Sequence, residues 1–431
     1  MNVRKEKAPA KFPERKLSGN SLLNRRALLR GALFSAGLAA AGTGIAEADV
    51  SIGTNSPEWM KTPGRPFSGY GMPAKSQEKV QRTFTIAPGH EGTGVSRTPL
   101  HDLEGTITPN GLHFERHHNG VPEIDPAQHE LFLHGMVKRP LAFSLDALLR
   151  YPMETHIRFI ECAGNSGAFT GDQPQQATAG DLNGLVSCSE WTGVRLATLL
   201  AEAGVTTEAE WVIAEGADAA AMSRSIPLGK CLDDAVIALF QNGEAIRPEQ
   251  GYPMRLLLPG FEGNMNVKWL RRLKVTDGPV NTRDETSHYT ELLPGGKAFQ
   301  FMFPEAVKSA IVKPSFGMDM KGPGLYEISG LAWSGAGRIS KVEVSTDGGK
   351  IWTLAPLVAP VLAKALTRFR LPWKWDGKPS TLMSRATDET GEVQPARSKW
   401  LAHYAPGQFY HYNAIQSWGV DADGEVKNVH I

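Results

Sequence analysis

The sequence predicts an α+β protein in which a mixed α/β domain precedes a β-sandwich of immunoglobulin type. The composition is that of ordinary globular protein, with 41% apolar residues, 21% charged residues and 45 glycines, which argues against a disordered, fibrous or all-helical chain. Near Pro314 the local pattern changes from mixed strands and helices to short strands alone. A length of 431 residues exceeds one hydrophobic core, so we expect at least two domains.

Residues 1–48 have the three parts of an export signal and are set apart from the fold. A basic stretch is followed by the pair Arg25 and Arg26, then by an apolar run over residues 27–45, and an A-x-A pattern ends at Ala48. Adjacent arginines before leucines are typical of a twin-arginine signal, which predicts export to the bacterial periplasm after cofactor insertion. The alternative is an N-terminal membrane anchor, because the apolar run is about as long as a short transmembrane helix.

The rest of the chain is mildly acidic. Residues 1–48 hold nine of the 46 Lys and Arg residues and three of the 45 Asp and Glu residues, which leaves 37 against 42 and a net charge of −5. Nucleic-acid binding needs a concentrated basic surface, so we expect no nucleic-acid partner. No apolar run of about 18 residues follows, and we expect no stable membrane anchor there.

Residues 49–97 are dense in Pro, Gly, Ser and Lys and predict an extended arm. Over the next two hundred residues, β-rich segments alternate with helix-like ones, which predicts the mixed domain. The β-rich segments include residues 129–137, 157–162, 210–216 and 252–260, and the helix-like ones residues 144–150 and 194–203. The second helix is predicted by leucines at helical spacing and by Gly204 at the C-cap.

Short strands separated by turn signals follow Pro314, and regular spacing of this kind predicts the sandwich. The strand-like segments are residues 325–335, 339–355, 368–375 and 382–395. The turn Asp347-Gly348-Gly349 lies between two alternating runs and predicts a β-hairpin.

Three cysteines, Cys162, Cys188 and Cys231, are too few for a disulfide-held scaffold. A disulfide between Cys188 and Cys231 is left open. No C-x-x-C-H occurs, so we expect no covalently attached c-type haem in this chain, and electrons from any redox reaction would leave through a partner.

Cys162 ends an apolar strand and enters a glycine-containing turn in the segment FIECAGNSG, residues 159–167. Such a cysteine can serve as a nucleophile, a redox thiol or a metal thiolate, and a buried structural thiol is the common alternative. Spacing alone leaves all four open.

The order of motifs resembles the sulfite oxidase family of molybdopterin enzymes. Cys162-Ala163-Gly164-Asn165 matches the family's metal-binding motif, TPNGLHFERHHNGVP at residues 108–122 matches the segment upstream, and QNGEAIRPEQGYPMRLLLPGFEGNMNVKWLRRLKV at residues 241–275 matches the long segment downstream. The similarity covers about residues 98–431. It implies a molybdenum-molybdopterin cofactor, a molybdopterin-binding oxidoreductase domain at residues 98–300 and an immunoglobulin-like dimerisation domain at residues 301–431.

The resemblance also assigns roles by position. Cys162 is the expected protein ligand of the molybdenum, and a thiolate suits a soft, redox-active metal. Arg116, Cys162 and Tyr289 are the expected catalytic residues. The residues expected to bind the cofactor are His118, Cys162, Asp218, Arg255 and Lys268, of which Arg255 and Lys268 would neutralise its phosphate.

The sequence departs from free sulfite oxidases where they build an anion pocket from arginines. Ser166 and Gly167 stand where the family has an arginine just after the cysteine motif, and Gln250 replaces a histidine. Each cation lost from a dry pocket removes a contact to a dianion of about 1.5–3 kcal/mol. We also expect Gly167 to open space beside the metal.

These departures resemble the molybdenum subunits of sulfane dehydrogenases. That similarity implies sulfane sulfur on a sulfur-carrier protein as the substrate, oxidation to a sulfonate, a c-type cytochrome subunit as electron acceptor, and a homodimer within a heterotetramer. The alternatives are a sulfite dehydrogenase with a cytochrome c acceptor, a non-catalytic binding protein of the same fold, and an exported reductase of the superfamily. A zinc site at His113, His117 and His118 is supported only by spacing.

Overall fold

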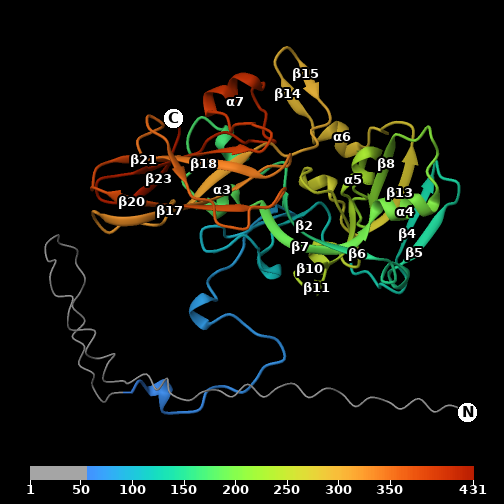
Figure 1. Cartoon of the computed structure of the whole chain (residues 1–431), viewed down its shortest axis with the longest axis horizontal. Coiled ribbons are helices and arrows are strands. Elements are labelled where there is room, and N and C mark those ends of the chain that lie inside the picture. Colours follow the sequence, from blue (N-terminus) through green and yellow to red (C-terminus); the bar gives the residue numbers. More distant parts are fainter. Residues whose placement is uncertain (1–55) are drawn as a thin grey trace, which may run out of the picture. The chain divides into compact units, whose positions relative to one another are not determined.

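The computed structural model describes residues 56–431, so the predicted export signal lies outside the described residues (Figure 1). The chain divides into two units at Phe67 and Ser68. In the described part of the first unit, residues Glu58–Met60 form the short 3-10 helix η1. The second unit, Ser68–Ile431, holds the two domains discussed below.

The first domain is built on two five-stranded sheets and a smaller sheet of three strands. One large sheet has the order β11-β10-β7-β6, with β12 also pairing with β10, and the other has the order β5-β4-β13-β8-β9. Only β4 and β13 pair in parallel. The strands of these two sheets are β4 (Glu130–Gly135), β5 (Leu141–Ser144), β6 (Met153–Glu161), β7 (Val186–Arg195), β8 (Trp211–Gly216), β9 (Ser223–Pro227), β10 (Val236–Gln241), β11 (Glu244–Ala245), β12 (Arg255–Leu257) and β13 (Leu270–Thr276).

The three-stranded sheet lies in the segment that precedes the large sheets. It joins β1 (Thr83–Ala87), β2 (His90–Arg97) and β3 (Glu115–His117) in antiparallel order. The predicted extended arm at residues 49–97 therefore contains a hairpin, whose second strand pairs with β3. Alternation was too weak to signal it, because β1 is almost wholly exposed and needs few apolar residues.

Helices in this domain are short and connect the strands. They are α2 (Leu145–Leu148), α3 (Ala179–Asn183), α4 (Leu196–Ala203), α5 (Leu228–Asp233) and α6 (Arg283–Ser287), with 3-10 turns η2 (Lys75–Gln77), η3 (Asn110–Leu112), η4 (Gly167–Thr170), η5 (Pro248–Gln250) and η6 (Gly263–Met265). The helix predicted over residues 194–203 is confirmed from Leu196, and Gly204 caps it in the left-handed conformation. Val194 and Arg195 belong instead to β7, because their backbone pairs with β10.

The second domain is a sandwich of antiparallel sheets, as the strand spacing predicted. One sheet has the order β16-β17-β20 and the other β19-β18-β21-β22-β23, and the two pack face to face (Figure 1). The strands are β16 (Lys308–Lys313), β17 (Gly324–Trp333), β18 (Ile339–Ser345), β19 (Thr353–Ala355), β20 (Thr367–Trp375), β21 (Ser380–Asp388), β22 (Ser417–Val420) and β23 (Val426–Val429). The hairpin predicted at Asp347-Gly348-Gly349 is confirmed, since β18 pairs with β19.

Two further elements lie beside the sandwich. A small hairpin of β14 (Glu291–Leu293) and β15 (Lys297–Phe299) connects the domains, and α7 (Arg397–His403) follows β21 (Figure 1). Backbone bonds from Ala405 to Leu292, and from Leu292 to the Gln408 side chain, tie the segment after α7 to that hairpin.

Three buried cores hold the second unit together. One lies between the two large sheets of the first domain. One fills the sandwich and continues onto β6 and β7 of the first domain. A smaller one holds Ile160, Trp191 and Leu257, against which Cys162 packs. The disulfide left open between Cys188 and Cys231 is absent: both thiols are free, and they belong to different cores. Within residues 56–431, no helix has the length and apolar character needed to cross a membrane.

Candidate active site

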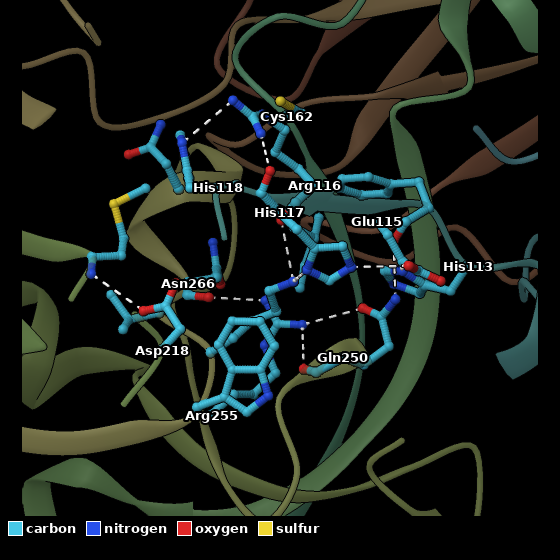
Figure 2. A pocket seen from close by; sticks show the side chains of 18 of the residues that line it. His113, Glu115, Arg116, His117, His118, Cys162, Asp218, Gln250, Arg255 and Asn266 are labelled. Carbon is cyan, nitrogen blue, oxygen red and sulfur yellow. Dashed lines mark hydrogen bonds and ion pairs between the residues drawn. The ribbon is translucent and has the colours of Figure 1, made fainter. Parts of the chain in front are cut away.

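All seven residues expected to act in catalysis or in cofactor binding line one cavity, which lies beside the end of β6 (Figure 2). They come from segments as far apart as residues 116 and 289. Their separation in the sequence does not by itself predict that they lie together. The seven are Arg116, His118, Cys162, Asp218, Arg255, Lys268 and Tyr289.

Cys162 follows the last residue of β6, where the chain leaves the sheet. Its amide donates to Leu185 O at 2.9 Å, and its carbonyl accepts from the Asn165 amide at 2.8 Å, which closes a tight turn. Burial raises the pKa of the Cys162 thiol, while the Gly164 amide and the charge of Arg116 act in the opposite direction. The thiol therefore needs a further cation, such as a metal, to become a thiolate at neutral pH.

Arg116 and His118 lie close to Cys162 in the cavity (Figure 2), and Tyr289, which also lines the cavity, contacts His118. Nη2 of Arg116 lies 3.4 Å from Nδ1 of His118, and the hydroxyl of Tyr289 lies 3.4 Å from Nε2 of the same imidazole. Burial lowers the pKa of His118 to about 4, so the ring is neutral at pH 7: its Nδ1 accepts from Arg116, and its Nε2 then carries the proton and donates to the Tyr289 oxygen. Burial and the negative charge of Cys162 raise the pKa of Tyr289, which stays a hydroxyl.

Arg255 and Lys268 supply positive charge elsewhere in the cavity. Arg255 donates to Gln250 O at 3.0 Å and Asn266 O at 2.9 Å, and Lys268 Nζ donates to Glu249 O at 3.0 Å. Burial lowers the pKa of Arg255 to about 9. Burial also lowers the pKa of Lys268, and the nearby charge of Arg255 lowers it further. Two desolvated cations held by backbone carbonyls form a site for a strongly charged anion.

Asp218 and the segment 263–266 complete the wall. Asp218 accepts from the Met222 amide at 3.4 Å. A Cβ at Gly263 would stand 2.5 Å from Glu161 O, so only glycine lets this segment lie against the end of β6.

The residues present fit a pterin cofactor that carries a phosphate. Among the described residues, three buried polar atoms of the cavity lack a partner: Arg255 Nε, His113 Nε2 and Asn264 Oδ1. Unpaired buried polar atoms are costly, and a ligand with acceptors and donors removes that cost. The cavity thus offers a soft thiol at one side, two cations and several neutral donors, which is the donor set this cofactor needs.

Gly167 does not open space, contrary to expectation. A Cβ at this position would stand 2.3 Å from Cε2 of Phe409, so an aromatic ring from the C-terminal domain already fills the volume. Ser166 is buried and donates to Asn183 Oδ1 at 2.6 Å, away from the cavity. Gln250 donates to Phe114 O at 3.0 Å and so supports the loop that holds Arg255.

Sequence reasoning missed the contribution of the C-terminal domain. Phe409 and Tyr410 lie near Cys162, and the His411 amide donates to Ala163 O at 2.8 Å. His411 also bonds through its ring to Glu262 and Glu291. Their spacing from Cys162, about 250 residues, gives no local signal, and only pairing of the domains brings them here.

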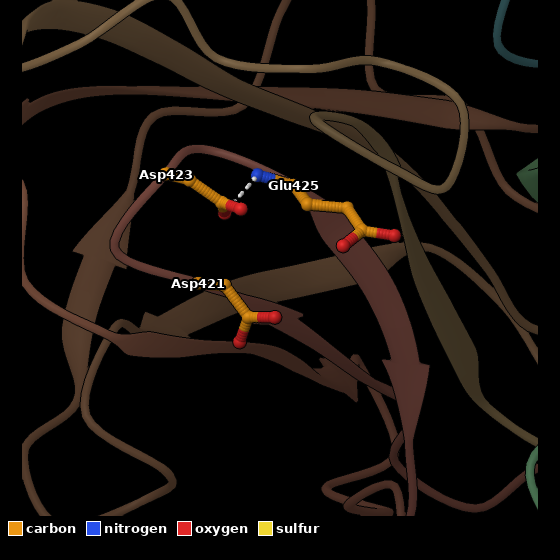
Figure 3. A group of neighbouring side chains, drawn as sticks. All are labelled: Asp421, Asp423 and Glu425. Atoms are coloured by element: carbon orange, nitrogen blue, oxygen red, sulfur yellow. Dashed lines mark hydrogen bonds between the residues drawn. The ribbon is translucent and has the colours of Figure 1, made fainter.

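The histidines considered for zinc have other partners. His113 Nδ1 bonds Phe114 O, His117 Nε2 bonds Glu115, and His118 bonds Arg116 and Tyr289. Between residues 56 and 431, the one cluster of metal-type ligands found is Asp421, Asp423 and Glu425, at the exposed turn between β22 and β23 (Figure 3). Lys427 Nζ lies 2.8 Å from both Asp421 and Glu425 and offsets their charge.

Comparison with known proteins agrees with this geometry. Residues 118–283 match the family model of the oxidoreductase molybdopterin binding domain, and residues 301–417 match that of the Mo-co oxidoreductase dimerisation domain. The chain is 32% identical to sulfite oxidase of Gallus gallus over 321 residues, 68% of this chain and 69% of that protein. It is 31% identical to the mitochondrial sulfite oxidase of Homo sapiens, over 68% of this chain and 58% of that protein.

A solved structure is more similar still. A chain of the sulfane dehydrogenase SoxCD from Paracoccus pantotrophus is 45% identical, with a TM-score of 0.85, over 88% of this chain and 98% of that one. The first family match includes the cavity residues His118, Cys162, Asp218, Arg255 and Lys268. The chain belongs to the sulfite oxidase family of molybdopterin-dependent oxidoreductases.

Proposed function

We propose that the chain is the molybdenum subunit of a sulfane dehydrogenase, which oxidises sulfane sulfur bound to a carrier protein to the level of a sulfonate. The observation that carries the proposal is the scarcity of positive charge at Cys162: of the described residues lining the cavity, Arg116 is the cation that acts on this thiol. A single cation beside the thiol, with Arg255 and Lys268 assigned to the cofactor phosphate, favours a sulfur chain of low charge over a free dianion. The 45% identity to a sulfane dehydrogenase supports the same substrate class.

In this proposal Cys162 binds the molybdenum, and Arg255 and Lys268 bind the phosphate of the pterin, with Asp218 and His118 as further contacts. The cofactor, when bound, supplies oxygen-atom transfer to sulfur. Each oxygen atom comes from one water, and each transfer releases two protons and two electrons, so conversion of a terminal sulfane sulfur to a sulfonate needs three transfers.

The side chains near Cys162 bind the substrate and donate hydrogen bonds to it. Arg116 attracts the negative sulfur, and its 3.4 Å contact with His118 holds the guanidinium in place. The Tyr289 hydroxyl, buried and protonated, can donate a hydrogen bond to an oxygen added to that sulfur. Because Arg116 can only donate, neutral His118 accepts at Nδ1 and carries its proton on Nε2, which points to the Tyr289 oxygen and leaves the Tyr289 O–H free for that bond.

Delivery and assembly are part of the proposal. The twin-arginine pattern at Arg25 and Arg26 supports export to the periplasm, and the family's dimerisation domain at residues 301–417 supports a homodimer. A separate c-type cytochrome subunit would take the electrons, in a heterotetramer. Co-purification from a native periplasm, haem staining and light scattering test these three statements together.

Steady-state assays decide the substrate. Purified holoenzyme should oxidise a peptide persulfide with ferricyanide as acceptor, and mass spectrometry should find the sulfonate. Sulfite dehydrogenase is the second candidate, supported by 32% identity to a sulfite oxidase and by the presence of Arg116. Fast turnover of micromolar free sulfite, without turnover of the persulfide, would replace the first proposal by the second.

A further inference from the structure

The Phe409 ring occupies the space that a side chain at position 167 would need. A Cβ at Gly167 would lie 2.3, 2.5 and 2.7 Å from three ring atoms of Phe409, all shorter than any normal carbon contact. A side chain at position 167 therefore requires the ring to move. Gly167 and Phe409 are a complementary pair, although 242 positions separate them in the sequence.

The ring is also close to Cys162. The position of a Cβ at Gly164 lies 3.1 Å from Cε1 of Phe409 and 4.0 Å from Sγ of Cys162, so the ring and the thiol flank the same point. Tyr410, the next residue, lies 5.5 Å from Tyr289 between ring centroids. Phe409 thus lies beside Cys162, next to the residues that line the cavity.

The segment that carries Phe409 is fixed at several points. The His411 amide donates to Ala163 O at 2.8 Å, within the cysteine motif itself. Gln408 accepts from the Leu292 amide at 2.8 Å and donates to Tyr410 O at 3.1 Å. These bonds fix the segment that carries the ring, so we expect the ring to keep this position when substrate binds.

Part of the ring stays in contact with solvent. Phe409 is 48% exposed, although a phenylalanine in a fixed, hydrogen-bonded segment usually buries most of its surface. An exposed apolar surface next to the proposed metal ligand favours a substrate with carbon atoms near its sulfur. The same apolar surface makes no favourable contact with a small hydrated dianion.

We propose that Phe409 is a specificity-determining residue: it excludes a cation from position 167 and offers its ring to the organic arm that carries the sulfur. This inference rests on the proposed function, since it names the feature that distinguishes a carrier-bound substrate from free sulfite. The ligand it selects is an alkyl persulfide on a peptide cysteine.

Thermal unfolding tests the packing of the pair without any substrate. Gly167→Arg should lower the unfolding temperature because Phe409 is displaced, and Gly167→Arg with Phe409→Ala should recover most of that loss. Additive effects in this double-mutant cycle would overturn the pairing, whatever the enzyme oxidises.

Kinetics on the holoenzyme test the specificity. Phe409→Ala should raise KM for the peptide persulfide roughly tenfold and leave kcat nearly unchanged, because the ring binds the arm and not the reacting sulfur. The double variant should lower KM for free sulfite roughly tenfold, because the new guanidinium then has room. Leu325→Ala, on β17 and 77% exposed, is the matched control and should change neither constant.

The outcomes separate the two proposals. Wild-type enzyme that oxidises sulfite and not the persulfide contradicts the proposed function, while the thermal cycle still reports on the pair. Wild-type enzyme that oxidises the persulfide, with an unchanged KM in Phe409→Ala, contradicts the role of Phe409 alone.

Discussion

Oε1 of Glu161 accepts a 2.9 Å hydrogen bond from Nζ of Lys308, in an ion pair that is almost fully buried. Glu161 ends β6 directly before Cys162, and Lys308 begins β16 of the sandwich. The same carboxylate accepts from Asn165 at 2.8 Å and from the Trp333 indole at 2.5 Å. The turn that presents the metal ligand is therefore fastened to the C-terminal domain.

Lys308→Met should destabilise the protein by about 3–5 kcal/mol, because it leaves the Glu161 carboxylate buried without a counter-charge. Urea unfolding followed by tryptophan fluorescence measures this loss. Lys341→Met, at an exposed ion pair with Glu343, should cost less than about 1 kcal/mol. Equal losses of unfolding free energy in the two variants would show that the buried ion pair stabilises the protein no more than the exposed one.

His411 should stabilise the protein in a pH-dependent way. Burial alone would lower the pKa of His411, but hydrogen bonds to Glu262 and Glu291 outweigh it, and together with the charge of Glu305 they raise this pKa well above its usual value. A raised pKa in the folded state contributes stability that is complete below the unfolded pKa of about 6.5 and is lost as pH rises through the folded pKa.

The difference in unfolding free energy between the wild type and His411→Gln should therefore be largest near about pH 6 and shrink toward alkaline pH. Urea titrations at a series of pH values measure it. His403→Gln, in the exposed last turn of α7, is the control and should show no such trend. A constant difference across the series contradicts a charged His411.

Arg255→Met and Lys268→Met should each weaken cofactor retention roughly tenfold to a hundredfold, because each removes a charge-assisted contact of about 1.5–3 kcal/mol. Pterin released during dialysis, read by fluorescence, gives the rate of loss. Arg271→Met, at an exposed ion pair with Glu215, should leave it unchanged. Retention by all three variants at the wild-type rate would place the phosphate elsewhere.

Rebinding of the cofactor to cofactor-free protein should weaken as pH rises above about 9. Burial lowers the pKa of Arg255 to about 9, and only the cationic form of its guanidinium attracts phosphate. Binding assays at neutral and strongly alkaline pH measure this effect. The Arg255→Met variant should lose that part of the pH dependence, and persistence of the full dependence would assign it to another group.

Cys162→Ser should reduce turnover by more than about 100-fold, since loss of a metal ligand exceeds the usual effect of losing a ligand's hydrogen-bond partner. Pterin content should stay near the wild-type value, because the contacts of Arg255 and Lys268 are untouched. Metal analysis and turnover on the same sample test both statements. Cys188→Ala, on β7 and not among the residues that line the cavity, should keep full turnover per bound metal.

Tyr289→Phe should lower kcat up to about tenfold, because the hydroxyl 3.4 Å from His118 is lost while the ring still packs under Arg224. The unfolding temperature should change little. Tyr326→Phe, whose hydroxyl donates to Gly322 O in the second domain, is the control for loss of a tyrosine hydroxyl. An unchanged kcat would remove Tyr289 from the catalytic residues.

The sequence predicted several of the strands and the residues expected to carry the chemistry of the cavity. Periodicity located β4, β6, β8, β17 and β20, and motif order selected seven residues that all line one cavity. It failed where the signal is not local. The hairpin β1–β2 is too exposed to show alternation, and Val194 joins β7 because its partner strand β10 decides its conformation.

The sequence by itself determined the family, the thiol at the end of β6 and the cations of the cavity, because each follows from short-range pattern and residue chemistry. Only the tertiary structure decided what stands beside Cys162. Packing of the sandwich against the first domain brings Phe409 into the space of Gly167 and Lys308 onto Glu161. Contacts between residues so distant in the chain depend on the shape of both folded domains, which no local pattern encodes.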